Sequence, residues 1–347
     1  MKTSSPSKSQ QPLVSILIQA YNGERYVREC LDSALAQTYE NFEIIFLDDH
    51  STDGTAAIVK EYVAREEATG SARLKYILPA KRLGIVEGRN ELLRQAKGEL
   101  LAWLDADDVY LPDKVKDEVE FLEAHEEFGV VYCQIGYFYD SDGVAAAAAK
   151  IYRHRNVPRS GSGPEMFACL LEKMFITNTA VMFRREIYKK LGGYRTDLGI
   201  VEDWEYFLRI AEAGYGIGFL DRDLVRYRLR SDSHTNFARQ VEVQESAVKI
   251  FEALRESGTL NPTDRARYRI DYWVARRYET YAIALAAAGR GREARVALLK
   301  ARAGFAGVAG FAKRTAIWIL SLTPAGLAGF LVESAWNRRK KGYFVEV

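Results

Sequence analysis

Leu100-Leu101-Ala102-Trp103-Leu104-Asp105-Ala106-Asp107-Asp108 is the stretch of this 347-residue sequence that decides the fold. Its first part is an apolar run of the length expected for a strand buried on both faces of a parallel sheet. Its second part holds three carboxylates within four positions. Carboxylates this close repel one another, and a divalent cation with oxygen ligands is the natural compensating charge. By itself the stretch also fits a solvated acidic turn that caps a helix starting near Pro112.

Strands and helices alternate before this stretch. Strands are expected at residues 13–18, 42–47 and 74–78, and helices at residues 24–37, 55–63 and 84–96. This alternation predicts a mostly parallel sheet with right-handed crossovers, a Rossmann-like α/β fold. Because parallel strands point the same way, the ends of strands one, two and four meet at one edge of the sheet.

The residues that meet at this edge predict a site for a nucleoside diphosphate. Tyr21-Asn22 offers an aromatic face for a base, Asp48-Asp49 offers a carboxylate to a base N–H, and the aspartates of residues 105–108 can hold a metal that bridges a diphosphate. Asp48 alone also fits a cap at the strand end. The sequence has neither G-x-G-x-x-G after the first strand nor G-x-x-x-x-G-K-[ST] anywhere, which disfavours dinucleotide enzymes and P-loop ATPases.

Four segments resemble glycosyltransferase family 2, whose members are inverting, nucleotide-sugar-dependent enzymes of the GT-A fold. The segments are residues 14–22 (VSILIQAYN), 35–45 (LAQTYENFEII), 48–55 (DDHSTDGT) and 104–108 (LDADD). The resemblance extends over about residues 12–230. It implies a GT-A catalytic domain at residues 12–235, preceded by a polar leader at residues 1–11 that is expected to be disordered.

The resemblance implies a base pocket at the ends of the first two strands. Tyr21 would line this pocket with Gln19 and Asn22 beside it, and Asp49 would hydrogen-bond the base; Tyr21 also fits a plain rim aromatic. Gln19 stands where members usually have a small hydroxyl residue or proline, and His50 stands where glycine, alanine or asparagine is common. Both of these residues would border the expected pocket, so the identity of the donor's base stays open. A UDP-linked donor is the expectation.

The resemblance also implies which residues hold the diphosphate. Arg89 matches a segment that helps to hold the donor, although a surface arginine of a helix fits it equally well. Asp105 and Asp107 match the D-x-D pair that meets the ribose and a divalent metal, Mn²⁺ or Mg²⁺, and the adjacent Asp108 could share either task. Arg230 stands where members often carry a histidine and could meet the diphosphate as a cation.

The proton acceptor is expected at Val201-Glu202-Asp203-Trp204. Direct displacement at an anomeric carbon needs a base for the acceptor hydroxyl, on the side opposite the metal. Glu-Asp followed by an aromatic residue matches the catalytic-base motif of the family, so Asp203 is the predicted base and Glu202 the alternative. Carboxylates at a helix N-terminus are also favoured by the helix dipole alone. Trp204 and Asn178 are candidates for the acceptor side, although Trp204 also fits core packing.

Composition and cysteine usage limit which other classes of protein fit the sequence. The formal net charge is only +2, which gives no basic field and no case for nucleic acid. Cys30, Cys133 and Cys169 fit no metal spacing and no disulfide framework, and the first residues lack the apolar core of a signal peptide. A reducing cytoplasm is therefore expected.

Residues 236–347 are expected to form a helical region. Helices are predicted near residues 241–257, 262–288 and 293–303, and the last two look like one hairpin of tetratricopeptide type, which is too little for a repeat array. Residues 316–332 contain no charged residue and lie within a possible membrane-associating segment at residues 313–341, with basic residues at both ends. A membrane span needs about 20 apolar residues. The segment fits an interfacial or re-entrant helix on an anionic leaflet, a helix packed on the protein, or a short span.

The sequence thus predicts a metal-dependent inverting glycosyltransferase. It would move a sugar from a nucleoside diphosphate to a saccharide or lipid-linked saccharide, in bacterial surface polysaccharide synthesis. Its expected place is the cytoplasm, or the periphery of the inner face of the cell membrane. Two other classes stay open: a glycosidase that uses two carboxylates, and a non-catalytic scaffold that binds a nucleotide-sugar or a glycan.

Overall fold

The computed structural model describes residues 11–139, 151–154, 159–230, 239–301, 315–323, 327–329, 331–332, 334 and 344–346. The chain divides into two compact units. The first unit consists of Met1–Tyr194, Tyr206–Leu229 and Val345–Val347, and the second of Arg195–Glu205 and Arg230–Phe344.

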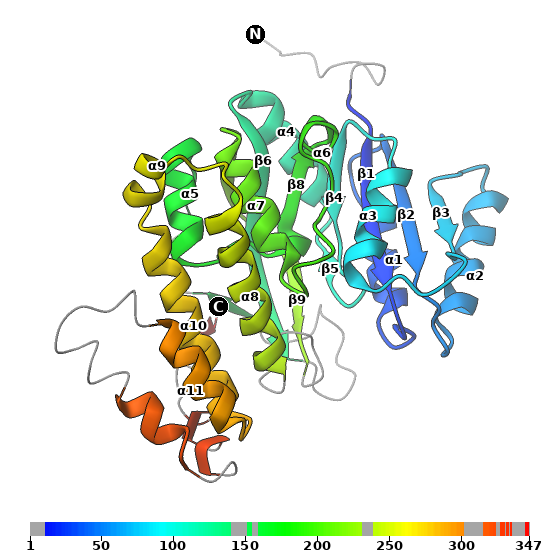
Figure 1. Cartoon of the computed structure of the whole chain (residues 1–347). Helices are drawn as coiled ribbons and strands as arrows, with labels where there is room; N and C mark the ends of the chain where they lie inside the picture. Colours follow the sequence, from blue (N-terminus) through cyan, green and yellow to red (C-terminus); the bar gives the residue numbers. More distant parts are fainter. Residues whose placement is uncertain are drawn as a thin grey trace. The chain divides into compact units, whose positions relative to one another are not determined.

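The first half of the chain alternates strands and helices as the sequence predicts (Figure 1). The elements are β1 (Val14–Ala20), α1 (Val27–Leu35), β2 (Phe42–Asp48), α2 (Thr55–Ala68), β3 (Leu74–Ile77), α3 (Ile85–Gln95), β4 (Leu100–Trp103), β5 (Val109–Tyr110) and α4 (Lys114–Ala124). Then follow β6 (Phe128–Tyr139), β7 (Tyr152–His154), α5 (Gly163–Glu172), the short 3-10 helix η3 (Asn178–Ala180), β8 (Val181–Arg184), α6 (Arg185–Leu191), α7 (Glu202–Glu212) and β9 (Gly216–Leu229).

These strands form one mixed sheet. Among the described residues its main path has the order β10-β7-β6-β8-β4-β1-β2-β3, where β10 is Phe344–Glu346, and β9 pairs with β5 and β6. The central pairs β1–β2, β2–β3 and β1–β4 are parallel, whereas β8 is antiparallel to both β4 and β6. The parallel half carries the predicted Rossmann-like winding. The chain moves outward from β1 to β3 and then returns to β4, so right-handed crossovers place α3 on the face opposite α1 and α2.

The core of the first unit lies on both faces of the central strands. Along β1, Ile16 and Ile18 join a buried cluster with α1 and α2, and Leu17 faces the other way and is equally buried. All four residues of β4 are buried. The continuous apolar runs in the sequence are therefore explained by burial on both faces, as the parallel arrangement requires.

The later strands differ from the sequence expectation. The apolar runs at residues 215–220 and 225–230 suggest two short strands in the sequence, but β9 is one strand of 14 residues. It pairs in parallel with β6, and its register shifts by a bulge between Cys133 and Gln134, opposite Leu220 and Asp223. The bulge accommodates the exposed Asp221 and Arg222, whose polarity suggests a turn in the sequence. The run at residues 178–183 suggests a strand in the sequence, but its first three residues form η3 and β8 starts only at Val181.

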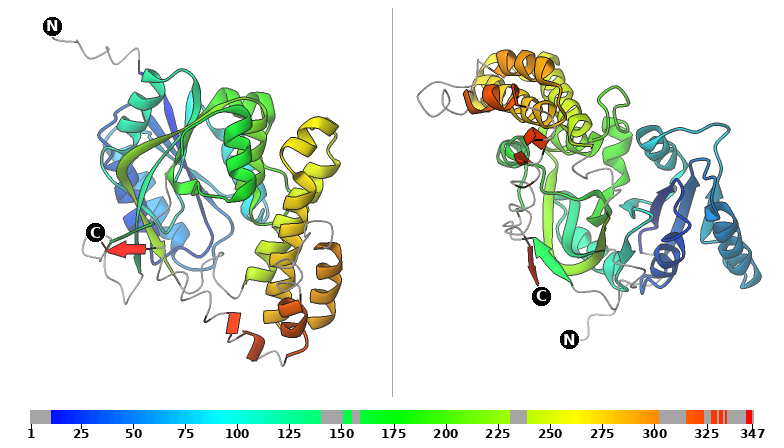
Figure 2. Two further views of the ribbon diagram at one scale, coloured as in Figure 1. Left: turned by 90° about the vertical axis from the view of Figure 1, so that its left-hand side faces the viewer. Right: turned by 90° about the horizontal axis from the view of Figure 1, so that it is seen from below.

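The second unit is helical, as predicted. It contains α8 (Gln240–Glu256), α9 (Pro262–Arg267), α10 (Ile270–Ala287) and α11 (Gly291–Lys300). Helix α10 packs against α8 and α11 (Figure 2), and α10 and α11 form the expected hairpin through a turn with Gly289 at a φ of 76°. Within the described ranges, no helix has the length and apolar character needed to cross a bilayer.

Candidate active site

The acidic turn after β4 carries Asp105, Asp107 and Asp108 in three different environments. The Asp105 side chain is 35% exposed, and Asp107 is partly exposed, whereas Asp108 is 1% exposed. The backbone N–H of Asp108 donates to the Asp105 carbonyl at 2.9 Å, which closes the turn. Two carboxylates of the D-x-D pair are therefore accessible to a ligand, and the third is enclosed by protein.

Asp108 supports the turn from inside. Its Oδ1 accepts a hydrogen bond of 2.9 Å from the backbone N–H of Arg228 on β9. Burial raises the pKa of Asp108 well above its usual value, and the charges of Asp107 and Asp105 raise it further. This position favours a structural role for Asp108, whereas the sequence left it able to share the ribose or the metal with its neighbours.

Arg228, on the neighbouring strand β9, links the acidic turn to helix α1. Its Nε donates to the Asp107 carbonyl at 2.9 Å, and its Nη2 lies 2.5 Å from Oε2 of Glu29 on α1. The guanidinium is stacked over the rings of Tyr26 and Phe138, at 4.9 and 4.6 Å from their centroids. The Arg228 side chain is 4% exposed, so these contacts fix the backbone of the turn from a dry interior.

Two further groups hold Asp105. Nη2 of Arg89, on α3, lies 3.3 Å from Asp105 Oδ1, and the Asp105 N–H donates to Thr179 Oγ1 at 3.3 Å. Arg89 is therefore brought to the acidic turn, as the donor-holding role requires, and is not a plain surface arginine of its helix. Asn178, a candidate for the acceptor side, is 3% exposed in η3, and its Oδ1 lies 3.5 Å from the Tyr194 hydroxyl.

A buried series of polar side chains is hydrogen-bonded to the last residue of β4. The Tyr110 hydroxyl donates to the Trp103 carbonyl, and Lys114 Nζ donates to the same hydroxyl at 3.0 Å. Lys114 Nζ also pairs with Glu118 Oε2 at 2.7 Å, and both side chains are fully buried. Burial raises the pKa of Glu118 to about 7, although the Lys114 cation opposes this shift.

The loops after β1 and β2 hold one another. Asn22, at a φ of 54°, donates from its backbone N–H to Ser51 Oγ, and its side-chain oxygen accepts from the Thr52 N–H. Asp48 Oδ1 accepts from the Ser51 N–H at 2.8 Å, which is the strand-end cap expected as its simpler role. Asn22 therefore joins the two loops, and Tyr21 beside it is 44% exposed.

Asp49 and Gln19 both bind the loop that leads into α3. The two oxygens of Asp49 accept from the N–H groups of Leu83 and Gly84, at 2.6 and 2.9 Å. Gln19 Nε2 donates to the Gly84 carbonyl at 3.0 Å. In this conformation both side chains position the loop, and Asp49 is only 2% exposed.

Arg82, on the same loop, brings a cation to the expected base pocket. Its guanidinium carbon lies 3.7 Å from the centroid of the Tyr21 ring, and its Nε is 3.8 Å from Asp49 Oδ2. Stacking of this kind covers one face of an aromatic ring. The pocket therefore combines an aromatic ring, a carboxylate and a guanidinium.

Helix α7 begins with the predicted base. Asp203 is partly exposed, and its Oδ1 accepts from the Trp204 N–H at 2.8 Å, whereas Glu202 is 1% exposed. Asp203 is thus the more accessible carboxylate of the two. Arg230, the predicted cation for the diphosphate, directly follows β9 and is partly buried.

Trp204 takes the packing position rather than that of an open platform. It is 8% exposed, its ring lies 5.4 Å from that of Phe251, and the Arg277 guanidinium lies 4.5 Å from its centroid. Burial lowers the pKa of Arg277 to about 10. The sequence allowed either a sugar-facing position or core packing for Trp204, and the surroundings of the ring favour core packing.

The donor set at the acidic turn fits a hard divalent cation. Asp105 and Asp107 offer carboxylate oxygens, which Mg²⁺ and Mn²⁺ prefer, and Mg²⁺ typically takes only one or two protein carboxylates beside substrate phosphates. In the part of the chain that the structure describes, no three His, Cys, Asp or Glu side chains are arranged as a complete metal site. The residues therefore suit a cation that shares a diphosphate.

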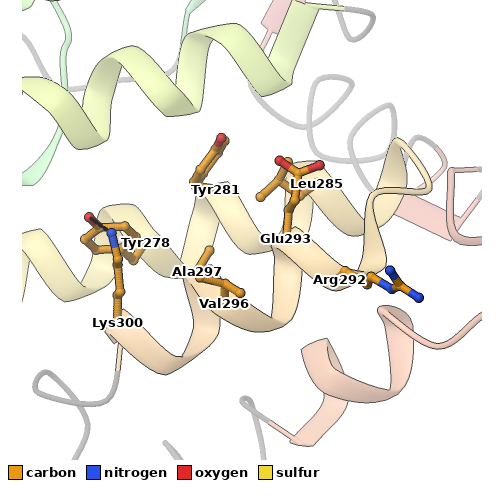
Figure 3. Close-up of a pocket in the computed structure, with 8 residues that line it drawn as sticks. All are labelled: Tyr278, Tyr281, Leu285, Arg292, Glu293, Val296, Ala297 and Lys300. Carbon is orange, nitrogen blue, oxygen red and sulfur yellow. Dashed lines mark hydrogen bonds between the residues drawn. The ribbon is translucent and has the colours of Figure 1, made fainter.

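A separate pocket of about 270 Å³ lies on the hairpin of α10 and α11 in the second unit (Figure 3). Aromatic and aliphatic side chains line it together with charged ones: Tyr278, Tyr281, Leu285, Arg292, Glu293, Val296, Ala297 and Lys300. Lys300 Nζ lies 3.3 Å from the Tyr278 hydroxyl. None of the residues predicted for the donor, the metal or the acceptor lines this pocket.

Arg228, Arg82 and Thr179 are the site residues that sequence reasoning missed. Arg228 had no distinguishing signal in the sequence, because it is one of three arginines that alternate along residues 225–230. Its partners lie 121 and 199 positions away in the chain. No local pattern could have identified them.

Sequence comparison gives a family match. Residues 15–192 match the sequence model of the family described as glycosyl transferase family 2. EpsE of Bacillus subtilis, which is named as a glycosyltransferase, is 33% identical to this chain over 247 residues. The alignment covers 70% of this chain and 82% of EpsE. TuaG of the same organism, named for a glycosyltransferase of teichuronic acid biosynthesis, is 34% identical over 112 residues, covering 32% of this chain and 42% of TuaG.

Solved structures share the fold at low sequence identity. The mannosyltransferase PcManGT of Pyrobaculum calidifontis, in complex with GDP-Man and Mn²⁺, has a TM-score of 0.55 at 22% identity, covering 91% of this chain and 88% of that one. Staphylococcus aureus TarS 1-349, in complex with UDP-GlcNAc, has a TM-score of 0.52 at 18% identity, covering 84% and 89%. These likenesses support the GT-A fold that the sequence predicts.

Proposed function

The chain belongs to glycosyltransferase family 2, and from that premise we propose that it transfers a sugar from a uridine diphosphate donor to a hydroxyl group of a saccharide or lipid-linked saccharide. The transfer is an inverting displacement that depends on Mn²⁺ or Mg²⁺. The observation that carries the proposal is the acidic turn after β4, where Asp105 and Asp107 stay accessible while Arg89 and Arg228 hold the turn.

The donor would lie along the ends of the parallel strands. Tyr21 and the Arg82 guanidinium offer a stacking surface for the base. Asp49 would offer a carboxylate to a base N–H once Arg82 and the Leu83-Gly84 backbone that it now binds move aside. Uracil presents such an N–H between two carbonyl groups, which suits a carboxylate beside a guanidinium. Asp105 and Asp107 would meet the ribose and the diphosphate. A bound Mg²⁺ or Mn²⁺ would offset the charge that develops on the departing diphosphate.

Asp203 would act as the base. The acceptor hydroxyl oxygen forms its bond to the anomeric carbon as the bond from that carbon to the diphosphate oxygen breaks, and the hydroxyl proton passes to Asp203. Attack from the side opposite the leaving group inverts the anomeric centre. Partial exposure of Asp203 and burial of Glu202 support this choice between the two.

The biological setting is inferred from the name of a relative. TuaG is named for teichuronic acid biosynthesis, and we propose that this chain also serves a bacterial surface polysaccharide. A cytoplasmic location suits its three free cysteines.

Calorimetric titration of UDP, GDP, CDP and dTDP, with and without Mn²⁺, tests the donor assignment. We expect UDP to bind at least tenfold more tightly with Mn²⁺ than without it. Preference for GDP would overturn the uridine assignment and leave the transferase in place. Binding of one nucleotide with no turnover of any of its sugars would favour the scaffold.

Two variants separate donor binding from proton transfer. Asp203→Asn removes a proton acceptor and no donor ligand, so we expect unchanged UDP affinity and loss of transfer by at least about 100-fold. Asp107→Ala should weaken Mn²⁺-dependent UDP binding itself. Glu205→Gln, on the same turn of α7, is the matched control for Asp203 and should transfer normally. Equal loss of UDP affinity in the Asp203 and Asp107 variants would contradict this division of roles.

A further inference from the structure

Large apolar side chains are exposed on one short segment of the second unit. Within residues 318–331, five of them are about half exposed: Trp318 (48%), Ile319 (54%), Leu322 (56%), Leu327 (52%) and Leu331 (47%). We call these five side chains the apolar face. Only five other large hydrophobic residues among the described parts of the chain are comparably exposed, so half of this surface is gathered within 14 positions. Such gathering marks an interaction surface.

The segment is attached to the protein by its other side. Ile317, Ser321 and Ala328 are 5%, 8% and 0% exposed. Arg295 Nη1, on α11, donates to the Ser321 carbonyl at 3.3 Å. A Cβ on Gly291 would lie 2.2 Å from the same carbonyl oxygen, so the first turn of α11 approaches this backbone closely. The segment therefore rests on the α10–α11 hairpin (Figure 1). The exposed fractions of its five large apolar side chains show that the protein leaves them uncovered.

This arrangement reverses the usual pattern of a surface helix. A helix at a water interface normally carries polar residues on its outer side. Here the outer side is apolar, and residues 316–332 contain no charged residue at all. Trp318 adds a ring type that is enriched where an apolar phase meets water. These features fit contact with the headgroup and acyl boundary of a lipid layer.

Charge identifies the kind of lipid. Residues 301–347 carry seven Lys or Arg and two Asp or Glu, a formal charge of +5, although the whole chain carries only +2. The basic residues flank the apolar face in the sequence, at Lys313-Arg314 and at residues 338–341. Basic clusters next to an apolar segment favour anionic lipid headgroups. An anionic lipid layer matches both features, because its headgroups pair with the basic clusters and its acyl chains cover the apolar face.

We propose that the apolar face docks the enzyme on an anionic membrane surface, with Trp318 and Leu322 entering the boundary between headgroups and acyl chains. This docking does not depend on the proposed transfer reaction. It would bring the protein to the surface where a lipid-linked acceptor resides.

Vesicle co-sedimentation of the full chain tests the proposal. Vesicles of phosphatidylcholine with 30% phosphatidylglycerol are compared with pure phosphatidylcholine, at low and high salt. We expect at least tenfold stronger binding to the anionic vesicles at low salt. The variants Trp318→Glu and Leu322→Glu should each lose at least tenfold of that binding. Leu78→Glu is the matched control, because Leu78 is 53% exposed in the first unit, and it should bind as the wild type does.

A second readout removes the ambiguity of a folding defect. Brominated lipids quench a tryptophan that enters the acyl region, and this quenching should be smaller in Trp318→Phe, which keeps an apolar ring. Unchanged quenching in Trp318→Phe would overturn the proposal. Equal binding of Leu322→Glu and wild type would also overturn it. A wild-type dimer that Leu322→Glu dissociates, with no vesicle binding by either, would identify the face as a self-association surface instead.

Discussion

Replacement of Arg228 by methionine tests whether the acidic turn depends on a distant guanidinium. Methionine keeps most of the side-chain volume and removes the charge. The variant loses the contact with Glu29, the hydrogen bond to the Asp107 carbonyl and the stacking on Tyr26 and Phe138. The backbone hydrogen bond to Asp108 remains, because it comes from the main chain.

The magnitude follows from these contacts. Hydrogen bonds to charged groups contribute about 1.5–3 kcal/mol each, and a desolvated cation–π contact about 1–2 kcal/mol. Glu29 is 32% exposed, so water can partly replace its lost partner. Methionine also keeps apolar contact with the two rings, so the full sum of these contributions is not lost, and we expect the free energy of unfolding to fall by about 3–4 kcal/mol. Arg228→Lys should lose less, because it keeps the charge but not the planar fork.

Urea denaturation gives the free energy of unfolding, and calorimetry gives the affinity for UDP with Mn²⁺ under conditions where the variant is folded. Arg226→Met is the matched control: it lies two residues away on β9, and its guanidinium pairs with Asp223 at 2.7 Å instead of with Glu29 and the Asp107 carbonyl. We expect both variants to lose stability and only Arg228→Met to lose UDP affinity, by about tenfold. A stable Arg228→Met protein, or one with normal UDP affinity, would refute the positioning role.

Three further predictions concern the first unit. Burial raises the pKa of Glu118 from its usual 4.5 to about 7, so its contribution to stability is complete below pH 4.5 and disappears as the pH rises through 7. The free energy of unfolding should therefore fall with rising pH, by at most about 1.4 kcal/mol per pH unit. Urea denaturation between about pH 4.5 and 8 should show a smaller fall in Glu118→Gln. In the same assay, Gly98→Ala should lower the free energy of unfolding by about 2 kcal/mol or more. Its Cβ would lie 2.5 to 2.8 Å from three backbone atoms. Ellman's reagent should label only Cys169 in the native protein and three thiols in urea, because Cys30 and Cys133 are buried and burial raises the pKa of both thiols.

The parallel half of the sheet was predictable because its signals are local. Each strand is a short apolar run, each crossover helix has its own apolar spacing, and right-handed winding leaves few arrangements. The meeting of Tyr21, Asp49 and Asp105 at one edge follows from strand direction alone. Burial of individual site residues could not be predicted in this way, since Asp108 directly follows Asp107 in the sequence but lies in the interior.

The rest depends on contacts between distant parts of the chain. The polar Asp221-Arg222-Asp223 looks like a turn in the sequence, but pairing with β6 absorbs it as a bulge. Trp204 has the spacing of either a core residue or a sugar platform, and only Phe251 and Arg277, from later helices, decide between them. Such outcomes are tertiary, so local patterns carry no information about them.

The acidic turn brings together like charges that a ligand-free protein would be more stable without. The charges of Asp107 and Asp105 both raise the pKa of the buried Asp108. Removing one negative charge should therefore stabilise the folded protein. We expect Asp107→Asn to raise the free energy of unfolding at pH 8 by about 1 kcal/mol, less at pH 4, and to weaken UDP binding in Mn²⁺. Sites that hold charge for a ligand commonly show this opposition between stability and function. A loss of stability in Asp107→Asn would mean that the cations around the turn outweigh the repulsion between its carboxylates, and that the turn is built for the free protein rather than for the donor.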